Sequence, residues 1–347
     1  MEKVKVAAVQ AAPVFLDTDA TVDKIDRLSA EAAAAGAGLI VFPETFVPTY
    51  PDWIWRAKPW KDSGEYYGRL LQESVVVPGR VTDELGRIAR KAAAYLAIGV
   101  NEREPQGSTI YNTLLYFDDT GRLLGKHRKL VPTGPERLVW GYGDGSTLTV
   151  VDTPFGRLGG LICWENYMPL TRAAMYAQGV DIWVAPTWDT GDVWVSTLRH
   201  IAKEGGVHVI GCAACQHGRD VPPSMPRRDE MYTGAEDDWL CEGYSTIVKA
   251  DGSILAGPLV KETGIIYAEL NAASARSARR GLDTVGHYSR PEVFRLSVNT
   301  VATAAVAFAE QPAPLLAPPF LAGRVSDRDH DSDHDQHHEH RADAEDR

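Results

Sequence analysis

Short apolar segments alternate with helix-forming segments along most of this chain, and this alternation restricts the fold to the α/β class. Residues 4–10 are an apolar strand pattern, residues 18–35 an alanine-rich helix pattern, and residues 37–42 an apolar run that ends at Pro43. Together they predict a βαβ unit. With 44% hydrophobic residues in a chain of 347, there is enough apolar material for one large core.

The pattern continues to about residue 256. We expect a second helix over residues 81–95 and a third and fourth over residues 170–178 and 193–205. Further strands are expected over residues 96–100, 112–117, 123–129, 158–163, 181–186, 207–212, 245–249 and 253–256. Because these strands are apolar on both faces, they need cover on both sides, which predicts a layered α/β architecture with a mixed sheet.

The composition changes near the C-terminus. Four prolines fall between residues 312 and 319, and an acidic stretch with five histidines follows to residue 347. We therefore expect a catalytic domain over residues 1–311 and a linker with a disordered tail over residues 312–347. The histidines suggest metal capture, but a solvated tail with incidental metal affinity is the explanation that the composition favours.

Charge and cysteine content exclude several classes of partner. The net charge is −11 and there is no long basic run, which argues against binding to nucleic acid or to an anionic membrane. No segment approaches the length of a membrane span, and no export signal is visible. Four unevenly spaced cysteines do not make a disulfide framework, so we expect a cytoplasmic protein.

Reactive side chains follow three of the apolar segments. Glu44 comes after the strand that ends at Pro43, Lys129 closes the segment 125–129, and Cys163 closes the segment 159–163. Open α/β sheets place their sites where strands end. Taken singly, each has an ordinary structural explanation: a surface loop carboxylate, a solvated basic cluster and a small buried thiol.

The combination favours chemistry over these explanations. A thiol with an ordinary pKa near 8.5 needs a base or a nearby cation to attack at neutral pH, and a glutamate with a lysine supplies both. Gly159 and Gly160 permit close backbone approach before Cys163, and the backbone N–H of Trp164 is available to a developing anion.

Three segments then resemble the signature stretches of the nitrilase superfamily, in order and spacing. They are Phe42-Pro43-Glu44-Thr45-Phe46, His127-Arg128-Lys129-Leu130-Val131-Pro132-Thr133 and Cys163-Trp164-Glu165-Asn166-Tyr167-Met168-Pro169-Leu170. The Trp-Glu-Asn after Cys163 is similar to the true nitrilase branch. The resemblance extends from Val4 to about Phe294, with Gly286-His287-Tyr288-Ser289-Arg290-Pro291 as a late segment, and does not cover the tail.

The resemblance implies an α/β fold of the four-layer αββα sandwich type with mixed β-sheets. It also implies a homo-oligomer built from dimers, which in nitrilases often extends into spirals or filaments. The implied activity is hydrolysis of a small-molecule nitrile to a carboxylic acid and ammonia, without cofactor or metal. An amidase or a cyanide-degrading relative is the alternative within the superfamily, and a catalytically silent self-assembling protein is the alternative outside it.

Residue roles follow from the resemblance by position. Glu44 is then the general base, Lys129 the stabilising cation and Cys163 the nucleophile, while Glu136 helps to position substrate and water. For Glu136, a salt bridge to Arg137 or to another surface cation is the structural alternative. The candidate substrate-binding residues are Trp164, His127, Trp188, Tyr50 and Trp53, and core packing is the alternative for Trp188.

Two further cysteine patterns have both a functional and a structural explanation. Cys163 with His127 resembles a cysteine-protease pair, but such a pair has no need of Lys129. Cys212 and Cys215 have the spacing of a zinc or redox motif, yet no second ligand pair accompanies them, so buried structural thiols are favoured.

Overall fold

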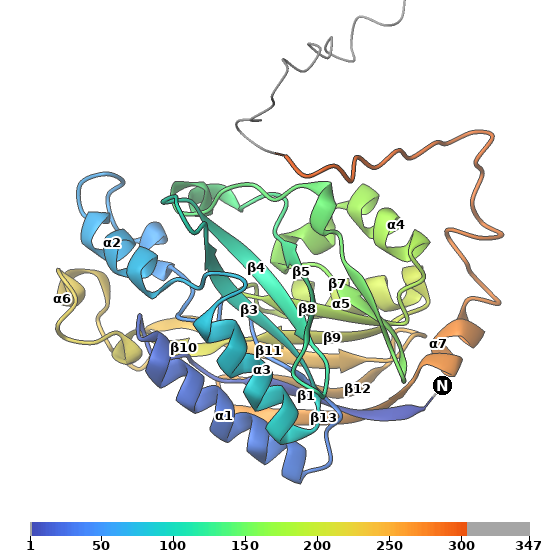
Figure 1. Ribbon diagram of the computed structural model, residues 1–347, viewed down its shortest axis with the longest axis horizontal. Helices are drawn as coiled ribbons and strands as arrows, with labels where there is room; N and C mark the ends of the chain where they lie inside the picture. The colour runs from blue at the N-terminus through green and yellow to red at the C-terminus, as the bar shows by residue number, and fades with distance from the viewer. Residues whose placement is uncertain (1, 304–347) are drawn as a thin grey trace, which may run out of the picture. The chain divides into compact units, whose positions relative to one another are not determined.

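Two mixed β-sheets lie at the centre of the computed structural model, which describes residues 2–303 (Figure 1). The first sheet contains β1 (Lys3–Gln10), β2 (Leu39–Val41), β3 (Tyr95–Arg103), β4 (Ile110–Phe117), β5 (Leu123–Arg128) and β13 (Gly264–Asn271). The second contains β6 (Val150–Thr153), β7 (Gly156–Gly160), β8 (Ile182–Thr187), β9 (His208–Ala213), β10 (Cys215–His217), β11 (Trp239–Val248) and β12 (Ile254–Val260).

Each sheet has a parallel centre and antiparallel edges. The first has the order β13-β1-β2-β3-β4-β5, with parallel pairs from β1 through β3. The second has the order β10-β11-β9-β8-β7-β6, with parallel pairs from β7 through β9 and with β12 paired to β11. The mixed sheets expected from the sequence are therefore confirmed.

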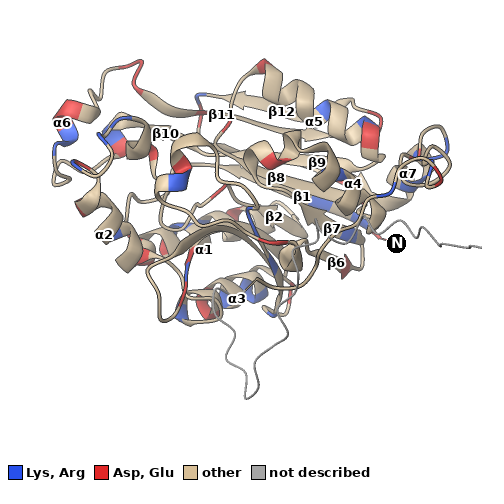
Figure 2. Cartoon of the chain, turned by 90° about the horizontal axis from the view of Figure 1, so that it is seen from above, with Lys and Arg blue, Asp and Glu red and all other residues tan. Residues whose placement is uncertain are grey.

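Helices cover the outer face of each sheet. The longest are α1 (Thr18–Ala34), α5 (Asp192–Gly205) and α3 (Arg80–Ala92), and the shorter ones are α2 (Gly64–Glu73), α4 (Pro169–Ala177), α7 (Ala272–Ala278) and α6 (Arg228–Met231). Figure 2 shows α1 and α3 on one side of the strands and α4 and α5 on the opposite side. The four-layer αββα sandwich is thus the observed architecture.

Three apolar layers hold the sandwich together. Ile25 of α1 and Ile88 of α3 pack with the outer face of the first sheet. Val41 and Val184 belong to the layer between the two sheets, and Leu198 of α5 packs against the second sheet. Apolar residues on both strand faces are what such a double-sided burial requires.

Helix α1 illustrates how the local sequence sets these elements. Asp17 caps its N-terminus, since its Oδ1 accepts from the Ala20 N–H at 2.9 Å. The buried residues Val22, Ile25 and Leu28 recur at helical spacing and form the face toward the sheet. The start expected near residues 17–18 is confirmed.

Some boundaries differ from the sequence expectation. The strand expected over residues 158–163 ends at Gly160, and Cys163 instead begins the 3-10 helix η4 (Cys163–Tyr167). The helix expected over residues 81–95 ends at Ala92, because Ala93 takes a left-handed conformation with φ of 48°. Helix α2, β13 and the short β6 and β10 were not expected.

The part of the chain beyond residue 303 lies outside the description. The boundary expected at residue 311 and the tail 312–347 both fall there. Among residues 2–303, no helix combines the length and the apolar character needed to span a membrane.

Candidate active site

Glu44 lies in the loop after β2 and is buried, with a side chain 0% exposed. Its Oε1 accepts from Lys129 Nζ at 2.9 Å and from Asn112 Nδ2 at 2.6 Å. Its Oε2 has no hydrogen-bond partner among the residues that the structure describes. The carboxylate is therefore fixed through one oxygen, while the other is free to accept a proton.

Lys129 follows the last residue of β5, and its side chain is fully buried. Its Nζ donates to Glu44 Oε1 at 2.9 Å and to Glu136 Oε2 at 2.7 Å. The backbone of Lys129 donates to the Asn112 carbonyl at 2.8 Å and accepts from the Gly143 N–H at 2.8 Å. The ammonium is thus held by two carboxylates, and the backbone is held by two further hydrogen bonds. Lys129 is therefore not part of a solvated basic cluster, the structural explanation considered in the sequence analysis.

Glu136 belongs to the 3-10 helix η2 (Gly134–Leu138) and is also buried. Its Oε1 accepts from the Tyr50 hydroxyl at 2.8 Å, and its Oε2 accepts from the Thr133 N–H at 2.6 Å. Arg137, the surface partner considered in the sequence analysis, donates to the Pro132 carbonyl instead. Glu136 therefore faces Lys129 in the interior.

Cys163 sits at a sharp turn out of the second sheet. Its φ of 51° lies in the left-handed region, which is sparsely populated by residues other than glycine. The turn follows Gly160, where a Cβ would come within 1.9 Å of the Val184 carbonyl oxygen on the neighbouring strand. The close approach of the two strands explains why residue 160 is a glycine. The turn that follows places the Cys163 thiol in the cavity described below.

Burial and neighbouring charges shift the pKa values of these groups in one consistent direction. Burial raises the pKa of the Cys163 thiol, and Glu44 raises it further while Lys129 opposes both. Burial likewise raises the pKa of Glu44, against the effect of Lys129. Burial alone would lower the pKa of Lys129, but the Glu44 and Glu136 carboxylates raise it above its ordinary value.

These directions define what the cluster can do. The resting thiol keeps its proton, since burial and Glu44 both disfavour the thiolate. A carboxylate with a raised pKa is a stronger base than a free one, and the ammonium remains charged throughout. The arrangement suits removal of the thiol proton during attack, not storage of a preformed thiolate.

A cavity of about 180 Å³ opens onto Cys163. Two stacked aromatic rings form one wall, since Trp188 lies over Tyr50 with ring centroids 4.2 Å apart and planes 9° apart. Trp164 is half exposed at the rim, and its indole Nε1 donates to Asp189 Oδ2 at 2.8 Å. The lining residues are Tyr50, Trp55, Thr133, Glu136, Cys163, Trp164, Trp188 and Asp189.

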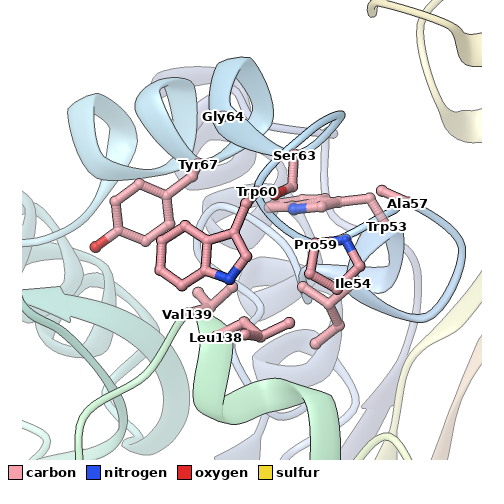
Figure 3. A pocket seen from close by; sticks show the side chains of 10 residues that line it. All are labelled: Trp53, Ile54, Ala57, Pro59, Trp60, Ser63, Gly64, Tyr67, Leu138 and Val139. Atoms are coloured by element: carbon pink, nitrogen blue, oxygen red, sulfur yellow. The ribbon is translucent and has the colours of Figure 1, made fainter.

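Four of the nine site residues suggested by the sequence do not line this cavity. Two of them, Glu44 and Lys129, are connected to it through Glu136, the lining residue that Lys129 contacts. The other two lie elsewhere, and the first is Trp53. It is completely buried, and it borders a separate apolar pocket together with the exposed Trp60 (Figure 3). Trp55, two residues later in the 3-10 helix η1 (Asp52–Trp55), lines the cavity with Cys163 instead. At three residues per turn, neighbours two apart point in different directions, and the sequence does not say which one faces the site.

The second is His127, which is buried among protein groups. Its Nε2 contacts Glu165 Oε2 at 3.0 Å and its Nδ1 contacts the Thr147 carbonyl at 2.9 Å. Lys129 lies beyond the last residue of β5, and its side chain contacts Glu44 and Glu136, so the side chains of His127 and Lys129 have different partners. His127 is thus not placed to touch a substrate, and a protease-type pairing with Cys163 has no contact to support it.

Besides Trp55, three residues near the site were not anticipated. Asn112 holds Glu44, Thr133 holds Glu136 through its backbone, and Asp189 holds Trp164. Asn112 is the first residue of the strand expected over residues 112–117, and Asp189 directly follows Trp188. The place of Asp189 just after β8 was an available signal, whereas Asn112 lies inside β4 and Thr133 precedes η2.

The other cysteines are structural in this fold. The Cys212 thiol donates to the carbonyls of Val9 and Val41 across the two sheets, and Cys215 and Cys241 are buried as free thiols. Within residues 2–303, no group of three or more histidine, cysteine or acidic residues is arranged to hold a metal ion. The five tail histidines lie outside that range.

Comparison with known proteins gives the family. The family model described as carbon-nitrogen hydrolase matches residues 5–280. The chain belongs to this family. A bifunctional nitrilase/nitrile hydratase from Nicotiana tabacum is 43% identical, with 88% of each chain covered. An aliphatic nitrilase from Sinorhizobium fredii is 45% identical, with 88% of this chain and 99% of the relative covered.

Solved structures agree on the fold of this carbon-nitrogen hydrolase. A member of branch 10 of the nitrilase superfamily from Saccharomyces cerevisiae superposes with a TM-score of 0.65 at 23% identity, covering 83% of this chain and 97% of the other. An amidase from Nesterenkonia superposes with a TM-score of 0.60, covering 80% and 94%. The expected superfamily and fold are confirmed, and the relatives place the chain with the true nitrilases.

Proposed function

We propose that this carbon-nitrogen hydrolase is a nitrilase that converts an organic nitrile and two water molecules to a carboxylic acid and ammonia. The observation that carries the proposal is the buried contact of Lys129 with both Glu44 and Glu136, because Glu136 lines the same cavity as Cys163. Two relatives that share more than 40% of their residues with the chain are named as nitrilases.

The first half of the reaction forms a covalent bond to Cys163. Glu44 accepts the thiol proton through its free Oε2 while the sulfur attacks the nitrile carbon. Negative charge develops on the nitrile nitrogen, where Lys129 and the Trp164 backbone N–H stabilise it. Proton transfer from Glu44 to that nitrogen gives a neutral thioimidate and restores the carboxylate.

The second half consumes two water molecules. Glu44 takes a proton from the first water as it adds to the thioimidate carbon, and the nitrogen leaves as ammonia, which gives a thioester. A second water, activated in the same way, releases the acid and returns the proton to the sulfur. Glu136 holds Lys129 and Tyr50 in place during both additions and orients the attacking water.

Amide release is the second candidate function, because one relative is named as a bifunctional nitrilase/nitrile hydratase. The tetrahedral species after the first water addition carries both an amino group and the sulfur. Loss of ammonia leads to the acid, while loss of the Cys163 thiolate leads to the amide. Amidase or cyanide-degrading activity would use the same residues on a different substrate.

One substrate panel tests these alternatives. Ammonia release and amide formation should be measured with aromatic, arylacetic, aliphatic and dinitrile substrates, with cyanide and with the matching amides. We expect turnover of nitriles with flat side chains, because four aromatic side chains line the cavity. Neither ammonia nor amide from any member would support the silent assembly protein instead.

Trp188 sets the choice among substrates in this proposal. Replacing it by alanine removes the ring stacked on Tyr50 and should shift relative rates toward bulkier arylacetonitriles by about tenfold. The amide fraction should change too, because Tyr50 holds Glu136. The matched control is Trp60→Ala, since Trp60 is 91% exposed and borders the other pocket. A common factor for all substrates with an unchanged amide fraction would mean that Trp188 only packs.

Asn112 should determine the acid limb of the pH profile. Its amide stabilises the charged form of Glu44, so its removal raises the pKa of Glu44 further above the ordinary value. Because Glu44 acts as a base only when ionised, Asn112→Leu should move the acid limb of kcat/KM upward by about one pH unit. The measurement is kcat/KM from pH 4 to pH 9. An unmoved limb would show that another group controls it.

The oligomeric state and the cellular location of the protein are proposed from the family resemblance. We propose a homo-oligomer of dimers that extends into a spiral or filament, as the resemblance implies, in the cytoplasm. Light scattering and electron microscopy test the first, and fractionation the second. We also propose that the catalytic domain ends near residue 311 and that the tail over residues 312–347 takes no part in catalysis.

A further inference from the structure

Glu165 lies two residues beyond the nucleophile and turns its carboxylate into the protein. Its Oε1 accepts from the Leu130 N–H at 2.7 Å, and its Oε2 accepts from the Ile162 N–H at 2.9 Å. Leu130 is the residue after Lys129, and Ile162 is the residue before Cys163. One buried carboxylate therefore ties together the two chain segments that carry the cation and the nucleophile.

His127 completes this arrangement as a cation. Its Nδ1 faces the Thr147 carbonyl, which can only accept, and its Nε2 faces Glu165 Oε2, which already accepts from Ile162. Opposite a carbonyl and a carboxylate, which both accept, the two ring nitrogens donate, and this makes the ring an imidazolium. Burial alone would lower the pKa of His127, but the Glu165 charge raises it above the ordinary value.

The pair therefore has little net charge of its own. Glu165 and His127 are both fully buried and neutralise each other at 3.0 Å. Glu44 and Glu136, by contrast, both act directly on Lys129. The Glu165–His127 pair can affect the chemistry only through the geometry of the backbone that it holds.

That backbone needs to be held, because Cys163 has a left-handed φ of 51°. Ile162 is fixed by Glu165 on one side of the cysteine. On the other side, Asn166 Nδ2 donates to the carbonyls of Leu161 at 2.9 Å and Cys163 at 2.8 Å. Hydrogen bonds thus hold the turn on both sides of Cys163. The Asn166 bonds stay within the turn, whereas Glu165 also binds the Leu130 N–H next to Lys129.

We propose that the buried Glu165–His127 ion pair is a positioning device that sets the placement of Cys163 relative to Lys129. The proposal rests on the proposed nitrile hydrolysis for its kinetic consequence. A shift in this placement would slow the chemical step, because reacting groups tolerate little displacement. Substrate binding would change little, since neither residue lines the cavity.

The test is the Glu165→Gln variant, which keeps one carbonyl oxygen but presents an amide N–H group to the second backbone N–H. We expect kcat to fall about a hundredfold while KM changes less than about threefold. Thermal unfolding and near-ultraviolet circular dichroism establish that the variant is folded. A kcat within about threefold of the unchanged enzyme would overturn the proposal.

The matched control is Glu102→Gln. Glu102 is also buried, and it pairs with Lys126 and Arg128, the residues on either side of His127 in β5. Loss of this ion pair should lower stability as much as the Glu165 change, yet leave kcat within about threefold. Equal losses of kcat in both variants would mean that any buried carboxylate on this strand has the same effect, and the proposal would fail.

A second readout does not depend on nitrile turnover. The rate at which iodoacetamide alkylates Cys163, followed by intact mass with Cys163→Ala as the blank, should fall about tenfold in Glu165→Gln and stay unchanged in Glu102→Gln. If the unchanged enzyme hydrolyses no nitrile, the proposed function fails while this rate still decides the positioning role. An unchanged alkylation rate would overturn it.

His127→Gln is the alternative if Glu165→Gln does not fold. The glutamine amide can donate to the Thr147 carbonyl or to Glu165, but it does not replace both contacts of the imidazolium. Glu165 then keeps its two backbone hydrogen bonds and loses its cationic partner. We expect a smaller fall in kcat, about tenfold, again with KM nearly constant. A kcat equal to that of the unchanged enzyme would overturn the proposal on this variant alone.

Discussion

Replacing Cys163 by alanine should abolish nitrile turnover and leave the protein folded. A methyl group cannot form the thioimidate. The protein stays folded because the change removes a single sulfur from the apolar layer between the sheets, which many other buried side chains fill. Cys163→Ser should also be inactive, with a loss of at least about a thousandfold, because a hydroxyl is much less acidic than a thiol and Glu44 is not a strong enough base for it. Ammonia release measures the effect, and circular dichroism monitors the fold.

Trapping the covalent intermediate is an independent test of Cys163 as the nucleophile. Protein quenched during turnover should carry the substrate mass on Cys163, as determined by peptide mass spectrometry. Cys215→Ala is the matched control, since Cys215 lies outside the cavity lining, and it should keep kcat within about twofold. A substrate adduct on Cys212, Cys215 or Cys241 instead would contradict the mechanism.

Lys129→Arg should lower kcat/KM by at least about a hundredfold although the charge is kept. The ammonium sits between Glu44 and Glu136 at 2.9 and 2.7 Å, with the Trp140 ring centroid 5.7 Å away. A planar guanidinium is wider than this space and points its donors in other directions. The carboxylates would have to move, and the base would lose its alignment with the thiol.

Lys126→Arg is the control for this substitution. Lys126 lies three residues earlier, is partly exposed and pairs with Glu102, a contact that arginine can keep. We expect its kcat/KM to stay within about twofold of the unchanged enzyme. Near-normal rates for Lys129→Arg would mean that the stabilising cation lies elsewhere.

Strand and helix identity followed well from local patterns, and boundaries followed less well. Double-sided apolar strands gave a correct layered α/β expectation, and Asp17 marked the start of α1. The strand end at Gly160 was missed because Leu161 and Ile162 are as apolar as the strand before them. Leu161 and Ile162 are buried in the turn that leads to Cys163. Hydrophobicity alone does not distinguish a buried turn residue from a buried strand residue.

Strand β13 shows a second kind of limit. It pairs with β1 across more than 250 positions of sequence, from Lys3 with Asn271 to Gln10 with Gly264. Such a pairing is set by tertiary contacts, because each strand alone is only a short extended segment. Helix α2 was missed for a related reason. Its buried residues Tyr66 and Leu70 pack with Trp53 and Ile54 of η1, and that tertiary contact is not visible in the local sequence.

The sequence by itself was enough to predict which residues carry the chemistry and roughly where they lie. Glu44, Lys129 and Cys163 each follow an apolar strand, and the resemblance added Glu136 and the family. Only the tertiary structure decided which side chains meet. It directed Trp55 and not Trp53 into the cavity, turned His127 away from it toward Glu165, and brought Asn112 and Asp189 to the site. The physical reason is that side-chain direction at strand ends and in short 3-10 turns depends on backbone angles and packing partners distant in sequence, which residue type does not encode locally.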